Sequence, residues 1–196
     1  EAIKYCKMAI DKGNGNAMVV YASMLENGKG IEVNYEEAIK YYKMAIDKGN
    51  PVAMNNYALM LLKGEGVEVN YKEAAKYFKM AIDKGCTLAL NNYAYMLENG
   101  CGCEVDIEGA LRYYKMSIDK GNTDAMIFYS YIFHNGIGVE INYEEAIKYI
   151  KMAIDHGSSD AMVIYGNLLR DGEGVDVDIQ EAIKYYQMAI GKGNSM

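Results

Sequence analysis

The chain has 196 residues, of which 51% are hydrophobic and 24% charged, a composition typical of a soluble globular or repeat protein. Its formal net charge of −7, without a cluster of Lys and Arg, excludes the basic surface on which nucleic-acid binding depends, and anionic lipid would repel it. No apolar run approaches the roughly 18 residues that cross a bilayer, and no signal peptide opens the chain. We therefore expect no nucleic acid and no membrane as partner. Because Glu1 already lies within a helical pattern, we expect a fragment of a longer protein.

An internal repeat organises the whole chain. The decapeptide YYKMAIDKGN at 41–50 has near-copies that begin at Tyr5, Tyr77, Tyr113, Tyr149 and Tyr185. Aligned on these copies, one alanine recurs every 36 residues without insertion, from Ala2 to Ala182. The periods are 1–36, 37–72, 73–108, 109–144 and 145–180, with a partial period at 181–196. They predict a single repeat domain that spans 1–196.

Each period predicts two helices. The first begins near Asn50-Pro51, a capping residue followed by a proline suited to the first helical position. Its apolar positions have the spacing of one helical face and are Ala53, Met54, Tyr57, Met60 and Leu61. Gly64 and Gly66 end it.

The second helix opens with the capping-box spacing of Asn70 and Glu73 and runs to about Lys84, where Gly85 is expected to adopt a left-handed conformation. Neither helix alone can bury its apolar face, so neighbouring pairs must stack. The sequence therefore predicts an all-α solenoid of about eleven helices.

The stretch AMNNYALMLLKGEGVEVNYKEAAKYFKMAIDKG, residues 53–85, resembles the Sel-1-like repeat, a relative of the tetratricopeptide repeat. The shared marks are an Ala and a Tyr in the first helix, a G-x-G-V turn, an Ala with an aromatic pair in the second helix, and a closing Gly. The turn recurs five times, with Ile31 and Cys103 in place of Val. The resemblance covers essentially the whole chain. It implies a right-handed α–α superhelix whose first helices line the concave side, and an adaptor that assembles complexes.

Many repeated side chains are interpreted as structural. The tyrosines in the positions of Tyr5, Tyr21 and Tyr42 are expected on buried faces, and those equivalent to Tyr35 are expected to pack against a neighbouring turn. One methionine column is expected to fill the core: Met8, Met44, Met80, Met116, Met152 and Met188. Lys43 and its charged neighbours are interpreted as a solvated face of the second helix.

The positions that the repeat leaves free are the candidates for recognition. We expect them to form a strip along the exposed side of the first helices, mixing aromatic, amide and charged groups that could hold a protein or peptide ligand. The predicted partner-binding residues are Asn55, Asn56, Lys63, Asn91, Asn92, Tyr95, Phe128, Tyr131, His134, Asn167 and Arg170. Paired asparagines near a lysine resemble the carboxylate clamps of tetratricopeptide proteins, although basic residues are scarce here. The alternative is an unconstrained surface.

The four cysteines occupy different places in the repeat, so no repeated disulfide framework is expected, and reduced thiols favour a cytoplasmic protein. The CGC at 101–103 is too sparse for a structural zinc site, so we expect no metal. No nucleophile has a positioned base, and the GEGV turn lacks the Lys-Ser/Thr and the strand of a P-loop. We therefore expect no catalytic residue and no cofactor.

Two functions from different classes remain. The first is a non-enzymatic scaffold or adaptor that binds a peptide or helix along the strip. The second is a structural or oligomerising spacer of a larger multidomain protein, such as a signalling enzyme, with end-to-end self-association through an uncovered helical face.

Overall fold

A computed structural model describes residues 1–193 of the chain, and within them it contains eleven α-helices and no strand. The helices are α1 (Ala2–Asp11), α2 (Gly15–Asn27), α3 (Tyr35–Asp47), α4 (Pro51–Lys63), α5 (Tyr71–Asp83), α6 (Thr87–Glu98), α7 (Ile107–Ile118), α8 (Thr123–Asn135), α9 (Tyr143–Asp155), α10 (Ser159–Asp171) and α11 (Ile179–Gly193). The even-numbered helices are the first helices of the repeats, and α3, α5, α7, α9 and α11 are the second. This confirms the all-α solenoid of helix pairs.

Side-chain caps begin most helices. The Asn50 Oδ1 accepts hydrogen bonds from the backbone N–H groups of Val52 and Ala53 at the start of α4. At the start of α5, the Asn70 Oδ1 accepts one from the N–H of Glu73, as the Asn-x-x-Glu spacing predicts. Each cap satisfies a donor that the first helical turn leaves unpaired. The caps therefore reproduce the helix boundaries in repeat after repeat.

In four of the five turns, all except the one at Gly30, the second glycine lies against the start of a second helix one repeat earlier. A Cβ added to Gly102 would stand 2.5 Å from the Cβ of Tyr71, and one added to Gly174 would stand 2.5 Å from the Cβ of Tyr143. Any side chain would clash at this distance, and φ is positive at both positions, a conformation that glycine adopts without strain. Both reasons require glycine here. The prediction that the tyrosines at the helix starts pack against a neighbouring turn is confirmed.

The core follows two inward-facing rows. In the first helices it contains the tyrosines equivalent to Tyr21, which are all buried. In the second helices it contains Ala38, Tyr42 and Ala45 with their equivalents in α5, α7 and α9. The methionine column is a correction. Met8, Met44, Met116, Met152 and Met188 are between 36% and 48% exposed, so they do not fill the core. Each stands one residue before the inward small residue, an alanine in four cases and Ser117 after Met116, and thus about 100° around the helix, at the edge of the buried face.

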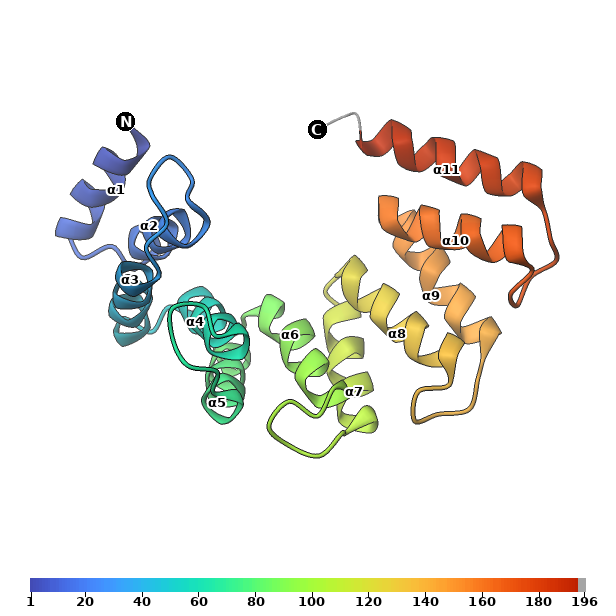
Figure 1. Cartoon of the computed structure of the whole chain (residues 1–196), viewed down its shortest axis with the longest axis horizontal. Coiled ribbons are helices and arrows are strands. Elements are labelled where there is room, and N and C mark those ends of the chain that lie inside the picture. Colours follow the sequence, from blue (N-terminus) through green and yellow to red (C-terminus); the bar gives the residue numbers. More distant parts are fainter. Residues whose placement is uncertain (194–196) are drawn as a thin grey trace. The chain divides into compact units, whose positions relative to one another are not determined.

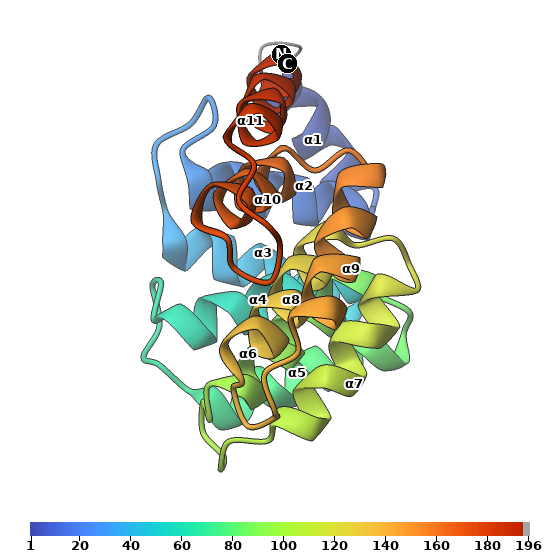
Figure 2. The ribbon, with the colours of Figure 1, turned by 90° about the vertical axis from the view of Figure 1, so that its right-hand side faces the viewer.

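The helices form two compact units, the first from Glu1 to Asp106 and the second from Ile107 onward. In unit 1, α2 packs against α3 and α4 against α5, and α3, α4, α5 and α6 follow one another as neighbours, as Figure 1 shows. In unit 2, α8 packs against α9 and α10 against α11, and Figure 2 shows α9 beside both α8 and α10. A single repeat domain and a right-handed superhelix stay predictions.

Candidate partner-binding grooves

Two grooves open between successive first helices, one in each unit. The α4–α6 groove has a volume of about 410 Å³ and the α8–α10 groove about 270 Å³. They occupy equivalent places two repeats apart, since Leu59 corresponds to Tyr131 and Tyr95 to Asn167. Six of the predicted partner-binding residues line them: Lys63, Asn92, Tyr95, Tyr131, His134 and Asn167.

The α4–α6 groove has a mixed lining. Leu59 and Leu62 supply apolar surface, and Lys63, Asn92 and Tyr95 supply polar groups, with Tyr71 and Cys101 completing the wall. Tyr95 is 43% exposed, and the side chain of Lys63 is 55% exposed and forms an ion pair with Glu65 at 3.7 Å. This groove could therefore combine an apolar contact with one to an acidic or amide group.

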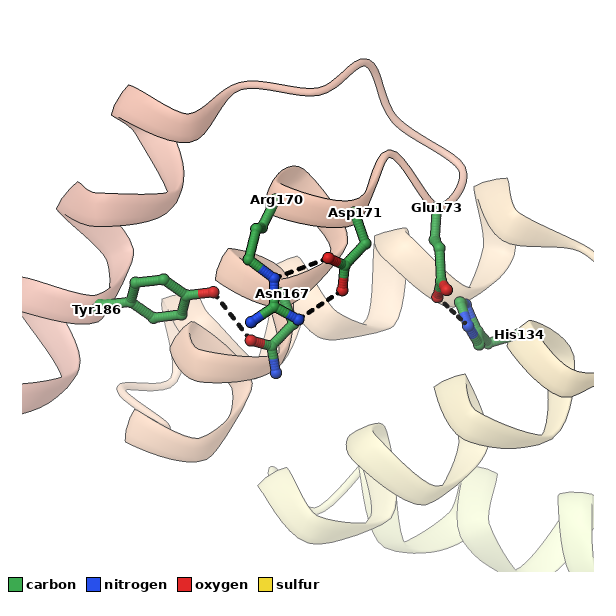
Figure 3. A network of polar contacts seen from close by, with 6 residues as sticks. All are labelled: His134, Asn167, Arg170, Asp171, Glu173 and Tyr186. Carbon is green, nitrogen blue, oxygen red and sulfur yellow. Dashed lines mark hydrogen bonds and ion pairs between the residues drawn. The ribbon is translucent and has the colours of Figure 1, made fainter.

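The α8–α10 groove is more apolar. Its floor contains Ile127, Ile150 and Ile164, and Tyr131 stands at its edge with 54% of its surface exposed. His134 also lines it and is held from outside the groove, because its Nε2 lies 2.9 Å from Oε2 of Glu173 in the turn after α10 (Figure 3). Such a concave surface with a few fixed polar groups is typical of a site for one large apolar side chain.

Asn167 is fixed from the opposite side of the same groove. The hydroxyl of Tyr186 on α11 donates a hydrogen bond of 2.9 Å to Oδ1 of Asn167, as Figure 3 shows. Gly166 makes room for that tyrosine, because a Cβ there would stand 2.6 Å from its ring. This hydrogen bond to its oxygen also fixes the orientation of the Asn167 amide nitrogen, so α11 holds the side chain in place without a ligand.

A chain of hydrogen bonds connects four helices of unit 1. The hydroxyl of Tyr42 donates to Oε2 of Glu26 at 2.6 Å and accepts from Nδ2 of Asn56 at 3.3 Å. The Nδ2 of Asn55 donates to Oδ1 of Asn56 at 3.0 Å, and the Oδ1 of Asn55 accepts from Nδ2 of Asn92 at 2.8 Å. Burial and the bond to Glu26 raise the pKa of Tyr42 far above its usual value, so its hydroxyl stays a donor.

This network corrects the place of Asn55. The side chain is only 2% exposed, so it belongs to the packing between helices and not to the surface on which the sequence pattern placed it. Asn56 is half-buried in the same network. One repeat later, Asn91 is half-buried and its buried Oδ1 has no hydrogen-bond partner within residues 1–193. These three asparagines line neither groove.

Phe128 and Arg170 also lie outside the lining of the grooves. Phe128 is half-buried and stacks on Tyr114, with ring centroids 5.8 Å apart. Arg170 is exposed, and its Nε and Nη2 each donate a 2.7 Å hydrogen bond to Asp171 (Figure 3). The guanidinium lowers the pKa of the Asp171 carboxyl. The charge of Arg170 is therefore already paired with its neighbour.

Several groove residues have no place in the predicted site: Leu62, Tyr71, Cys101, Ile127, Ser130, Ile150 and Leu168. Ile127 and Ile150 had a sequence signal. Ile127 stands where another repeat carries the polar Asn55, so it changes the character of that position. Ile150 stands where another repeat carries Phe78, so it keeps that position apolar. Which of these positions opens into a groove depends on how two successive first helices meet.

The part of the chain that the structure describes contains no group of three or more His, Cys, Asp and Glu side chains that could hold a metal ion. Among the same residues, no helix combines the length and the hydrophobicity needed to cross a membrane.

The stacked helix pairs and the grooves between first helices define an α-solenoid repeat protein. The Sel1 repeat model matches residues 1–14, 15–50, 51–86, 87–122, 123–158 and 159–194, which is almost the whole chain. The chain therefore belongs to the Sel1 repeat family, whose members are generally protein–protein interaction modules on a fold that is typically non-catalytic.

Solved structures support the same fold. A Sel1 repeat protein from Oxalobacter formigenes is 27% identical, with a TM-score of 0.84 over 96% of this chain and 78% of that one. A protective antigen of uropathogenic Escherichia coli with an SLR fold is 25% identical, with a TM-score of 0.80 over 98% of this chain and 41% of that one. An immunity protein from Pseudomonas aeruginosa shares the fold at 19% identity, with a TM-score of 0.71 over 97% of this chain and 73% of that one. Comparison with curated proteins gave no match.

Proposed function

We propose that this chain is a non-enzymatic interaction scaffold that holds a peptide or a helix of a partner protein in the grooves between its first helices. The α8–α10 groove is the observation that carries the proposal. It is a largely apolar hollow of about 270 Å³ with an exposed aromatic ring, Tyr131, at its edge. Exposed tyrosines beside apolar pockets are frequent anchors of protein interfaces.

The ligand expected there presents a large aliphatic or aromatic side chain. The three isoleucines that line the groove favour apolar contact. Two polar atoms of the same lining already have partners within the chain, since Nε2 of His134 contacts Glu173 and Oδ1 of Asn167 accepts from Tyr186. Preorganised walls lower the entropy cost of binding, because few side chains must be ordered when the ligand arrives. The α4–α6 groove, with Lys63 at its edge, would add a polar or acidic contact from the same class of ligand.

The test is selection of helical and extended peptides from a random display library on the folded chain, followed by NMR with isoleucine methyl labels. We expect bound peptides to shift the methyl signals of Ile127, Ile150 and Ile164. Tyr131→Ala should weaken binding about tenfold or more, the effect of truncating a tyrosine that acts as a hot spot of an interface.

The matched control is Val163→Ala. Val163 is 41% exposed on α10 but does not line the groove, so this variant should keep the affinity of the parent chain. Selected peptides that bind equally well to the Tyr131→Ala protein, or that shift only methyl groups outside the groove, would contradict the proposal.

Self-association is a second candidate, supported by the outer face of α11. Ile179, Ile183 and Ile190 are 48%, 41% and 64% exposed there, and their spacing places them on one side of the helix. A second copy that stacks on this face would bury it as one repeat buries the next. Light scattering should then show a mass that rises with concentration, and Ile190→Glu should abolish the rise. A constant monomer mass would exclude this mode.

A further inference from the structure

One of the five glycine turns carries two thiols. The turn after α6 contains Cys101 and Cys103 on either side of Gly102. The place of Cys101 is taken in the other repeats by Lys29, Glu65, Ile137 and Glu173, and that of Cys103 by Ile31, Val67, Val139 and Val175. The repeat itself therefore requires sulfur at neither position.

The two cysteines stand two residues apart, on either side of a turn in the backbone. The N–H of Cys101 donates to the carbonyl of Met96 at 2.9 Å, and Gly102 has a φ of 77°, so the chain turns between the cysteines. Consecutive Cα atoms lie about 3.8 Å apart, which limits the Cα separation of residues i and i+2 to about 7.6 Å even in an extended chain. The turn shortens that separation towards the span of roughly 4.4–6.8 Å that a disulfide bridges.

The thiols differ in access. Both are free, Cys101 is half-buried and Cys103 is exposed. They line one pocket of about 470 Å³ together with Lys72, Lys76 and Lys79, and Asp83 is the one acidic side chain in that lining. The net positive lining would attract an anionic reagent to the exposed thiol.

We propose that Cys101 and Cys103 form a redox site that closes reversibly to an intramolecular disulfide by exchange with an anionic low-molecular-weight disulfide of the glutathione type. The Cys103 thiolate attacks one sulfur of the reagent, which forms a mixed disulfide and releases one reagent thiolate. Cys101 then loses its proton to solvent, and its thiolate attacks the Sγ of Cys103. The Cys101–Cys103 bond forms and the second reagent thiolate leaves, so two cysteine thiols are oxidised and one disulfide is reduced.

The environment assigns this order of steps. Burial and the neighbouring Cys103 raise the pKa of the Cys101 thiol, so this sulfur is the poorer nucleophile towards a reagent in solution. In the second step its attack is intramolecular, and proximity offsets the small thiolate fraction. A ring this small is strained, and strained, exposed disulfides are readily reduced, which makes the closure reversible.

Cys101 also lines the α4–α6 groove, on the other side of the same turn. Closure onto Cys103 would draw its sulfur out of that wall. The effect on ligand binding rests on the proposed function, whereas the redox chemistry does not, and the experiment measures the chemistry alone.

The experiment uses the chain with Cys86→Ser, because trypsin releases peptide 85–112 between Lys84 and Arg112 and only Cys101 and Cys103 then remain in it. Ser158 already stands at the equivalent position of α10, so this background should fold. The protein is equilibrated with reduced and oxidised glutathione, free thiols are alkylated, and the peptide is weighed by mass spectrometry. We expect it to lose two hydrogen atoms and take up no alkyl group, and a dithiol should reverse the change.

Two single variants in the same background serve as matched controls, and circular dichroism verifies their helical fold. Cys101→Ser should accumulate the glutathione adduct on Cys103. Cys103→Ser should form its adduct on Cys101 about tenfold more slowly, because the half-buried thiol must react first. A parent peptide that stays reduced, or that keeps a glutathione adduct without closing, would overturn the proposal.

Discussion

The Nδ2 of Asn92 donates a hydrogen bond of 2.8 Å to the Oδ1 of Asn55, which stands 37 residues earlier on the preceding first helix. The bond joins α6 to α4, two helices that the chain does not connect directly. Because Asn55 also donates to Asn56, the same amide serves both its own helix and the next. The network is therefore a polar contact between repeats within an otherwise apolar interface, and removal of its centre has a predictable cost.

Replacement of Asn55 by leucine should destabilise unit 1. The variant would leave the Nδ2 of Asn92 and the Oδ1 of Asn56 without their present partners. An unsatisfied buried polar group costs about 1–3 kcal/mol, and we expect a loss of that size in the free energy of unfolding, measured by urea denaturation.

Asn91→Leu is the matched control. Asn91 occupies the same place one repeat later, and its buried Oδ1 has no hydrogen-bond partner in the described part of the chain. Its replacement should leave the stability unchanged or raise it, because an apolar group removes a desolvation penalty. Equal losses in the two variants would show that the hydrogen bonds around Asn55 add nothing to stability.

The close approach of Gly102 to Tyr71 predicts different costs for the same substitution in two turns. Gly30 and Gly102 are equivalent and have φ values of 74° and 77°, but an added Cβ meets nothing within 4 Å at Gly30 and lies 2.5 Å from the Cβ of Tyr71 at Gly102. Gly30→Ala should cost about 1–2 kcal/mol for the left-handed backbone alone. Gly102→Ala should cost about 1–3 kcal/mol more, because the clash displaces the turn. Thermal denaturation compares them, and equal shifts would refute the packing argument.

The cap of α6 can be improved. Cys86 stands at its N-cap and accepts no side-chain hydrogen bond, whereas Ser158 at the same place in α10 accepts one from the N–H of Ala161 at 3.2 Å. Cys86→Ser should raise the stability by about 0.5–1 kcal/mol, the lower part of the range measured for good N-caps, since some buried sulfur contact is lost. The reverse change, Ser158→Cys, should lower it. A decrease with Cys86→Ser would contradict the assignment of the cap.

Alkaline pH should weaken unit 2 through Tyr129. Burial and the nearby Tyr149 raise the pKa of Tyr129 from 10.0 to about 12. The folded chain therefore holds the phenol proton of Tyr129 more tightly than the unfolded chain does. The resulting contribution to the free energy of unfolding is complete below pH 10 and is lost as the pH rises towards about 12. Urea denaturation across this range should show a steeper decline for the parent chain than for Tyr129→Phe. Parallel declines would exclude Tyr129 as a cause.

The helix pairs could be predicted because their determinants are local and repeated. Asn50 and Asn70 cap the helices that their positions indicate, and Gly64 ends α4 in a left-handed conformation. Each signal lies within a few residues of the structure it specifies, and several copies exclude a chance pattern. The packing of Tyr71 on the turn at Gly102 could also be anticipated, although its distance could not. A large residue at the start of the second helix and a glycine in the turn recur together with the same 36-residue period.

Face assignments were less reliable, because one residue along a helix is about 100° around it. Met44 was expected in the core, yet it is 36% exposed while Ala45 beside it is fully buried. Asn55 was expected on the surface, yet it is buried. Both residues stand at the border of an apolar stripe, where the width of the buried face decides the outcome.

The family, the period, the helix boundaries and the small residues that allow repeats to approach could all be read from the chain, since they follow from local patterns that recur from repeat to repeat. Which variable side chains meet became visible only in the folded protein. Six predicted binding residues line the two grooves, whereas Asn55 and Asn56 satisfy one another and their neighbours. The physical reason is that a groove is made by two successive helices, and its lining depends on the angle and spacing at which they pack, which no single repeat encodes.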